Sequence, residues 1–281
     1  MNTTLESDAS VHESLTIAGL AAEHVSPPVR KCRHSIVLIP GMWCTAKTFV
    51  PLMLDLSLKG YECFALSLEG HGKSQSWKDL GKLSLDDYVA RARQAIAVIR
   101  RLSGDKVVIV GHSMGELIAA RIADLEAMHV VAHIGITSAP PRRVLMGFRA
   151  MLRMPKYIGA MVAGKAFKLS SADARRLLGN SLSEQETRDM VQGLVAESGT
   201  AAFDITRGYE VKKIACPALL IGASDDAITP RQRPVAKRIG AEFKEVEGCH
   251  MLMVGKSLPA LSRTMHEWLR CRLAKAFRTD L

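Results

Sequence analysis

The sequence predicts an α/β fold in which helices flank a mostly parallel central sheet and an all-helical cap is inserted between two strands. Three observations support this prediction. Short β-branched apolar segments alternate with segments of helical periodicity along most of the chain, as in a parallel sheet covered on both faces. Residues 107–120 combine an apolar strand, a Gly-x-Ser-x-Gly turn and an apolar helix. Residues 140–209 contain helical patterns only, as expected of a cap.

This pattern divides the 281 residues into a first core part at 1–139, a helical cap at 140–209 and a second core part at 210–281. Residues 1–14 show no regular pattern, so we expect them to be loose. The elements expected in the first core part are one or two short strands within 15–25, strands at 35–39 and 61–68, a helix at 49–58, a glycine-rich loop at 69–74, a helix at 83–102, the strand and helix of 107–120, and a strand at 130–136.

Two of the expected helices begin with the spacing of a capping box, in which a serine and an acidic residue three positions later cap each other's backbone N–H groups. The pairs are Ser84 with Asp87, and Ser183 with Glu186 at the start of a cap helix that we expect to end near residue 196. The elements expected in the second core part are strands at 218–221 and 242–246, and helices at 234–239 and 257–276.

The composition is that of a globular protein. Apolar residues make up 48% of the chain, and no run of about eighteen of them occurs that could span a bilayer. The first residues lack the basic start and apolar block of a secretory signal. The six cysteines are scattered without a Cys-x-x-Cys pair, which is typical of reduced thiols. We therefore expect a cytoplasmic protein without stable membrane insertion.

The chain is basic, with a net charge of +10, but no basic stripe interleaved with aromatic residues points to nucleic acid. Most Lys and Arg residues are expected to be solvated surface; the alternative is one anion-attracting patch between Arg142 and Lys168. No cluster of His, Asp and Glu has the spacing of metal ligands, and neither a Gly-x-x-x-x-Gly-Lys nor a Gly-x-Gly-x-x-Gly motif occurs. The sequence therefore implies no metal and no cofactor.

The turn at 111–115 has the features of a nucleophile elbow. Such a turn holds its serine, here Ser113, in a strained backbone conformation that exposes the hydroxyl above the sheet. Gly111 and Gly115 lack Cβ atoms, so strand and helix can approach closely. The helix begins just after Ser113, so its free N–H groups face the position where an oxyanion would form.

A serine needs a base to accept its proton and an anionic group to orient that base. In a parallel sheet, three such groups meet when each follows the carboxyl end of a strand. Ser113 follows one expected strand, Asp225 and Asp226 follow a later one, and His250 follows the last. The chain order is serine, acid, histidine.

These motifs resemble those of the α/β-hydrolase superfamily, and the resemblance runs from about residue 35 to the C-terminus. The residues that carry it are Val-Leu-Ile-Pro-Gly-Met-Trp, Gly-His-Gly-Lys-Ser, Gly-His-Ser-Met-Gly, Cys-Pro-Ala-Leu-Leu-Ile-Gly-Ala-Ser-Asp-Asp-Ala-Ile-Thr-Pro and Gly-Cys-His. The resemblance implies Ser113 as nucleophile, His250 as base and one aspartate as acid. Asp226 stands four residues before Pro230, as the acid commonly does in similar hydrolases; Asp225 is the alternative.

The resemblance also implies an oxyanion hole made by the backbone N–H groups of Met42 and Met114. The chain has Pro40 where many relatives have histidine, which removes a side-chain hydrogen bond but not the N–H donor. His71 and His112 are expected to serve packing.

The substrate expected for this site is a small molecule with an apolar acyl or alcohol part. Trp43, Met146 and Met151 are expected to border its pocket, since methionine adapts to irregular apolar ligands; the alternative for these side chains is packing in the core. The favoured function is a serine hydrolase that cleaves carboxylic esters through an acyl-enzyme. The alternatives are a thioesterase, a lactonase or an acyltransferase on the same residues, and a non-hydrolytic lyase, cofactor-free oxygenase or ligand receptor of the same fold.

Overall fold

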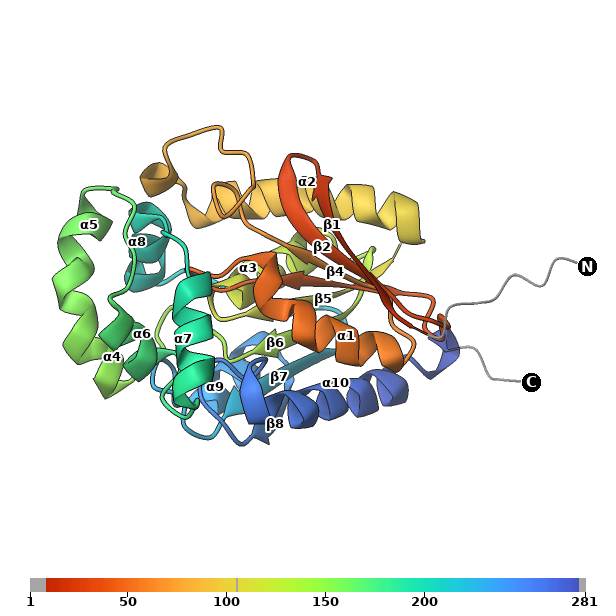
Figure 1. Cartoon of the computed structure of the whole chain (residues 1–281). Helices are drawn as coiled ribbons and strands as arrows, with labels where there is room; N and C mark the ends of the chain where they lie inside the picture. Colours follow the sequence, from red (N-terminus) through yellow and green to blue (C-terminus); the bar gives the residue numbers. More distant parts are fainter. Residues whose placement is uncertain (1–8, 105, 278–281) are drawn as a thin grey trace, which may run out of the picture.

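The computed structural model describes residues 9–104 and 106–277. Within them, eight strands form one sheet in the order β1-β2-β4-β3-β5-β6-β7-β8, with helices on both faces (Figure 1). β1 and β2 pair antiparallel, as do β2 and β4, and every pairing from β4 to β8 is parallel. The strands are β1 (Val11–Ile17), β2 (Leu20–Ser26), β3 (Ser35–Ile39), β4 (Cys63–Leu66), β5 (Val107–His112), β6 (Val130–Ile136), β7 (Ala218–Ala223) and β8 (Glu242–Val246).

The two faces of the sheet are covered by different helices. The longer helices are α1 (Val50–Leu58), α2 (Leu85–Ser103), α3 (Met114–Leu125), α9 (Gln232–Ile239) and α10 (Leu258–Arg272). α1 and α10 pack together on one face, where Val108 and Val110 of β5 point. α2 and α3 cover the other face with Val107 and Ile109, and α9 packs there over β7. Alternation of side chains along the buried strands thus supplies both halves of the core.

Five short helices lie between β6 and β7 and gather at one end of the sheet, on the left in Figure 1. They are α4 (Phe148–Arg153), α5 (Ile158–Val162), α6 (Ser171–Leu177), α7 (Glu184–Gly193) and α8 (Gly199–Arg207), and together they are called the helical segment below. No strand occurs among the described residues of this segment, and its single isolated bridge joins Phe167 to Glu197. The strandless interval predicted from the sequence is therefore present.

Both predicted capping boxes form, at the start of α2 and of α7. Several predicted limits differ from the structure, four of them by more than the end of an element usually varies. The strand expected at 61–68 is shorter in the structure, where β4 runs from Cys63 to Leu66. The helix expected to reach residue 196 ends at Gly193, and the helix expected at 257–276 ends at Arg272, before a 3-10 turn. Residues 11–14, expected to be loose, belong to β1, while residues 1–8 lie outside the described residues. β1 is an edge strand that is held by backbone pairing with β2. Its residues 11–14 are exposed, so they need no apolar side chains and show no apolar alternation in the sequence.

Within residues 9–104 and 106–277, no helix combines the length and the apolar character that a bilayer crossing requires.

Candidate active site

Ser113 occupies the sharp turn between β5 and α3. Its backbone has φ 54° and ψ −120°, a region that residues with a Cβ rarely adopt. The turn is held by hydrogen bonds on both sides: the N–H of Ser113 donates to the carbonyl of Ile136 at 3.0 Å, and its own carbonyl accepts from the N–H of Glu116 at 3.0 Å. The surrounding backbone therefore imposes this conformation on the serine.

The two glycines of the turn are required by close backbone contacts. A Cβ atom on Gly115 would lie 2.2 Å from the carbonyl oxygen of Ile39, and a Cβ on Gly111 would lie 2.3 Å from the carbonyl oxygen of Gly115. Both distances are far below van der Waals contact. The elbow therefore packs against β3 only because these positions carry no side chain.

The loop after β3 lies directly against the serine. A Cβ atom on Gly41 would lie 2.8 Å from the Cβ of Ser113. The loop turns at this point, because the N–H of Cys44 donates to the carbonyl of Gly41 at 3.2 Å and Trp43 has φ 63°. Met42, the residue after Gly41, belongs to this turn and lines the same pocket as Ser113, and the role of its N–H in an oxyanion hole stays a prediction.

Met114, the other residue expected to provide an N–H, is the first residue of α3. Helix geometry leaves the first N–H groups of a helix without an intrahelical acceptor, and the positive end of the helix dipole lies there. The turn therefore presents an N–H donor immediately after Ser113.

His250 is paired with Asp226, and both side chains are buried. The Nδ1 of His250 lies 3.0 Å from Oδ1 of Asp226, and the same oxygen accepts backbone N–H groups from Ile228 at 2.8 Å and Thr229 at 3.1 Å. Burial raises the pKa of the Asp226 carboxyl, but the His250 imidazole and these N–H donors outweigh burial and lower it. Asp226 is therefore a carboxylate that orients the ring of His250.

Asp225 points elsewhere. It is more than half exposed, and its carboxylate accepts a hydrogen bond from Nδ2 of Asn180 at 2.6 Å and lies 3.5 Å from Arg149. Both of these partners belong to the part of the chain between β6 and β7. Asp225 thus joins the core to this part, while Asp226 faces the imidazole.

The other nitrogen of His250, Nε2, is buried and has no hydrogen-bond partner among the described residues. The backbone of His250 is fixed, because its carbonyl accepts from Oγ1 of Thr137 at 2.8 Å and from Nε2 of His112 at 3.1 Å. Burial, with a contribution from His250, lowers the pKa of His112 to about 3, so the ring of His112 is a neutral donor. His112 therefore supports the neighbouring histidine through its main chain.

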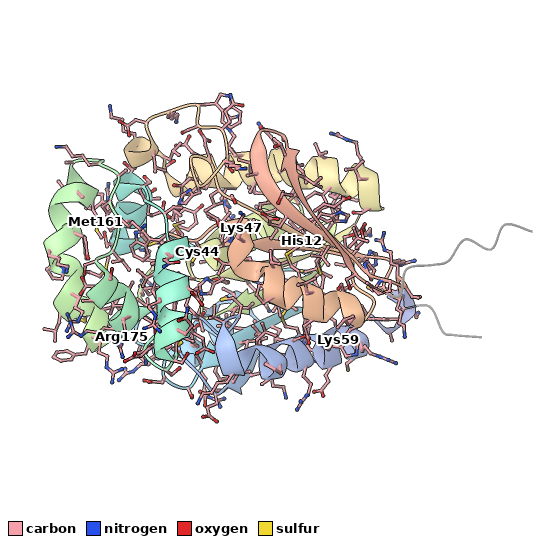
Figure 2. The ribbon with its side chains drawn as sticks, in the orientation of Figure 1. His12, Cys44, Lys47, Lys59, Met161 and Arg175 are labelled. Atoms are coloured by element: carbon pink, nitrogen blue, oxygen red, sulfur yellow. The ribbon has the colours of Figure 1, made fainter. Side chains whose placement is uncertain are left out.

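Ser113 and His250 line the same pocket, which is closed on the other side by the helical segment. Its other walls are mostly apolar, and its volume open to the centre of a water molecule is about 50 Å³. Cys44 reaches the pocket from the core and Met161 from α5; both are labelled in Figure 2. The remaining lining residues are Met42, Trp43, His112, Ala139, Pro140, Met146, Met154, Leu178, Ala202, Ile205, Thr206, Ile228 and Met251.

Of the three residues expected to border a substrate, two line this pocket and one does not. Trp43 and Met146 are in its wall. Met151 is 55% exposed and faces outward, so the expectation for this residue is wrong. The reason is the helical turn of α4, which directs Ala150 inward and the next side chain away from the core.

A buried polar cluster behind the pocket has no counterpart in the sequence-based expectations. Its centre is Glu197, just before α8, which is fully buried. Its Oε1 accepts from the hydroxyl of Tyr88 at 2.8 Å and the N–H of Ser198 at 2.6 Å; its Oε2 accepts from Nε2 of His71 at 3.1 Å and the N–H of Trp43 at 3.3 Å. We call these five residues the Glu197 cluster. It joins the helical segment to the loop that lies against Ser113.

The surroundings of His71 in this cluster favour its protonated, cationic form. Its Nδ1 faces the carbonyl of Glu69 at 3.1 Å and its Nε2 faces Glu197, so both ring nitrogens have acceptors. Burial lowers the pKa of His71, but the Glu197 carboxylate and the hydrogen bonds outweigh it and raise the pKa. The histidine expected to serve packing therefore forms a buried ion pair.

Among the described residues, no group of three or more His, Cys, Asp and Glu side chains has an arrangement that could hold a metal ion.

Residues 36–259 match the sequence model of the alpha/beta hydrolase family. A relative from Mycoplasma pneumoniae named "Putative esterase/lipase 2" is 26% identical over 213 residues, which cover 74% of this chain and 76% of that protein.

Solved structures agree on the fold. A thermophilic esterase from Thermogutta terrifontis superposes with a TM-score of 0.70 at 15% identity, covering 93% of this chain and 99% of that one. A soluble variant of monoglyceride lipase from Saccharomyces cerevisiae gives 0.70 at 17% identity and covers 98% of both chains. With the family match over most of the sequence and the strand order described above, the chain belongs to the alpha/beta hydrolase family.

Proposed function

We propose that this protein is a serine hydrolase that cleaves a carboxylic ester of an apolar small molecule. In this proposal Ser113 is the nucleophile, His250 the general base and Asp226 the acid that orients it. The observation that carries the proposal is the pocket in which a serine in a strained elbow and the unpartnered Nε2 of a buried His–Asp pair both lie. The esterase and lipase names of the relatives support the same class of reaction.

The first half of the reaction acylates the enzyme. The Oγ of Ser113 attacks the ester carbonyl carbon while Nε2 of His250 accepts its proton. The oxyanion of the tetrahedral intermediate accepts hydrogen bonds from the N–H groups of Met42 and Met114. The C–O bond to the alcohol then breaks, and His250 returns the proton to the leaving oxygen. Asp226 stays ionised and stabilises the imidazolium between these two proton transfers.

The second half releases the acid. A water molecule gives a proton to His250 and attacks the acyl carbonyl, which forms a second tetrahedral intermediate in the same oxyanion hole. Collapse of this intermediate breaks the bond to Oγ, and Ser113 recovers its proton from His250. The low pKa of Asp226 keeps its negative charge available throughout.

We further propose that residues 140–209 act as a cap over the acyl or alcohol part of the substrate. Met146, Met154 and Met161 turn toward the nucleophile from this region. A volume of about 50 Å³ holds only a few water molecules, so a substrate requires the cap to shift or its methionines to repack. The contacts of Asp225 with Asn180 and Arg149 hold the closed position. We place the protein in the cytoplasm, in line with its six unpaired cysteines.

Covalent labelling tests the proposal. A fluorophosphonate probe is expected to label the wild type and the Ser171→Ala control, an exposed serine in α6, but not Ser113→Ala. With p-nitrophenyl esters from acetate to decanoate, Ser113→Ala and His250→Ala are expected to lower kcat by about 10³-fold or more. Parallel acyl-thioester substrates compare ester with thioester cleavage. Undiminished turnover by Ser113→Ala would refute the proposal.

A further inference from the structure

The outer side of α4 and α5 carries an unusual concentration of exposed apolar side chains. Six of the fourteen large hydrophobic side chains that are exposed in the described part of the chain lie within residues 145–162. Their exposed fractions range from 51% to 76%. We call this surface the α4–α5 face; its apolar residues are Leu145, Phe148, Met151, Leu152, Ile158 and Val162. Such a concentration of exposed apolar side chains within one short segment indicates an interaction site.

The inward sides of α4 and α5 already pack against the rest of the protein. α4 buries Ala150, and α5 buries Met161, which lines the pocket. A surface helix ordinarily presents polar residues opposite its buried side. Here the outward side is apolar as well, so the packing of the protein itself does not account for it.

The same stretch holds most of the excess positive charge of the protein. Residues 142–176 contain nine Lys and Arg residues and one acid, Asp173, a net charge of +8 out of the +10 of the whole chain. Asp173 is already paired with Arg153 and Lys156. Eight of the nine basic residues are exposed, among them Arg175 on α6, which Figure 2 shows at the outer edge of the helical segment.

We propose that the α4–α5 face docks the protein peripherally on an anionic lipid bilayer, with α4 and α5 lying in the interface. An apolar surface flanked by Lys and Arg is complementary to such a bilayer, because the apolar side chains enter the acyl boundary while the cations remain among anionic headgroups. Since the inner side of the same helices lines the pocket, docking sets the proposed site close to the lipid.

Charge and side-chain type disfavour two other partners for the α4–α5 face, a second copy of this protein and a nucleic acid. A second copy would bring two strongly positive faces together, which costs electrostatic energy. Nucleic acid matches the charge, but single strands bind by stacking on aromatic rings, and of the six apolar residues of the face only Phe148 is aromatic. Aliphatic side chains such as Leu145 and Leu152 gain little from phosphate and much from hydrocarbon.

Vesicle flotation with the full-length protein tests the proposal. Vesicles of phosphatidylcholine with about a third phosphatidylserine are expected to bind the wild type, and vesicles of phosphatidylcholine alone to bind it at least about tenfold more weakly. Raising NaCl from about 0.1 M to about 1 M shortens the screening length from about 10 Å to about 3 Å and is expected to weaken binding. Ser113→Ala is expected to bind as the wild type does, which separates docking from the proposed catalysis.

Matched variants locate the surface. The double variant Phe148→Ser, Leu152→Ser is expected to lose at least about tenfold in vesicle partitioning, because two deep apolar contacts are removed. The control Leu58→Ser, Leu102→Ser changes side chains that are 69% and 72% exposed on α1 and α2, and it is expected to bind within about twofold of the wild type. Circular dichroism checks that all variants are folded. Equal loss in both double variants, no preference for anionic vesicles, tighter binding to a DNA or RNA oligonucleotide, or self-association at the α4–α5 face would each overturn the proposal.

Discussion

Removal of the Glu197 carboxylate is expected to destabilise the protein strongly. The side chain is fully buried and accepts four hydrogen bonds, two from backbone N–H groups, one from Tyr88 and one from His71. A buried donor that loses its acceptor costs about 1–3 kcal/mol. Adding four such costs overestimates the effect, because His71 can lose its proton and the Tyr88 hydroxyl can rotate. Breaking one buried ion pair typically costs about 3–5 kcal/mol, and we expect Glu197→Ala to fall in this range.

Urea denaturation followed by tryptophan fluorescence and circular dichroism measures this loss. A loss of about 3–5 kcal/mol corresponds to a decrease in Tm of roughly 6–20 °C for a domain somewhat smaller than this one. The control is Glu184→Ala in α7, whose carboxylate is 74% exposed and lies 3.6 Å from Arg188 at the surface. We expect this control to unfold within about 0.5 kcal/mol of the wild type. If Glu197→Ala and Glu184→Ala unfolded at the same urea concentration, the structural role assigned to the Glu197 cluster would be wrong.

The pH dependence gives a second measurement on the same cluster. The pKa of His71 is raised in the folded protein above its usual value of about 6.5. The stability from this ion pair is therefore fully present below about pH 6.5 and is lost as the pH rises through the folded pKa. The gap in unfolding free energy between wild type and Glu197→Gln should thus be larger at about pH 6 than at about pH 9. A gap that widens toward alkaline pH would contradict a cationic His71.

Three further predictions concern the acid, the elbow and the thiols. Asp226→Asn is expected to lower kcat for p-nitrophenyl esters by about 10³-fold or more, because it removes the acceptor at Nδ1 of the base, whereas Asp225→Asn should stay within about threefold. Gly115→Ala places a Cβ 2.2 Å from a backbone carbonyl and is expected to cost more than about 3 kcal/mol in urea unfolding, while Gly193→Ala, with nothing within 4 Å, should be neutral or slightly stabilising. A colorimetric disulfide reagent at about pH 8 is expected to react quickly with one thiol, that of Cys271, and this rapid reaction should be absent in Cys271→Ser. Cys271 alone among the six cysteines is exposed, and burial raises the pKa of four of the others.

Much of the fold could be predicted from local sequence patterns. The limits of β3, β6 and β8 agree with the strands expected at 35–39, 130–136 and 242–246, because the residues within and beside each strand carry its signal. Both capping boxes formed for the same reason, since they depend on residues three positions apart. Only the first residues of β1, 11–14, were missed, because an edge strand is recognised by its partner, β2, and not by its own side chains.

The candidate site likewise has features that local sequence predicts and features that depend on distant residues. The elbow at Ser113 and the chain order of serine, acid and histidine are readable from the sequence, since turn geometry and strand ends are local properties. The Glu197 cluster was not found. Glu197 is separated from His71 by 126 positions and from Tyr88 by 109, and its neighbours in the sequence look like an ordinary polar loop.

The sequence alone determined the order of strands and helices, the two glycines that the elbow requires, and the residues proposed as nucleophile and base, because each depends on sterics and periodicity within a few residues. The tertiary structure decided the rest. It placed Asp226 beside His250 and turned Asp225 toward the helical segment, it directed Met151 to the surface, and it buried Glu197 against the loop beside Ser113. These outcomes depend on how distant segments pack, and packing selects among side chains that are equivalent in the sequence.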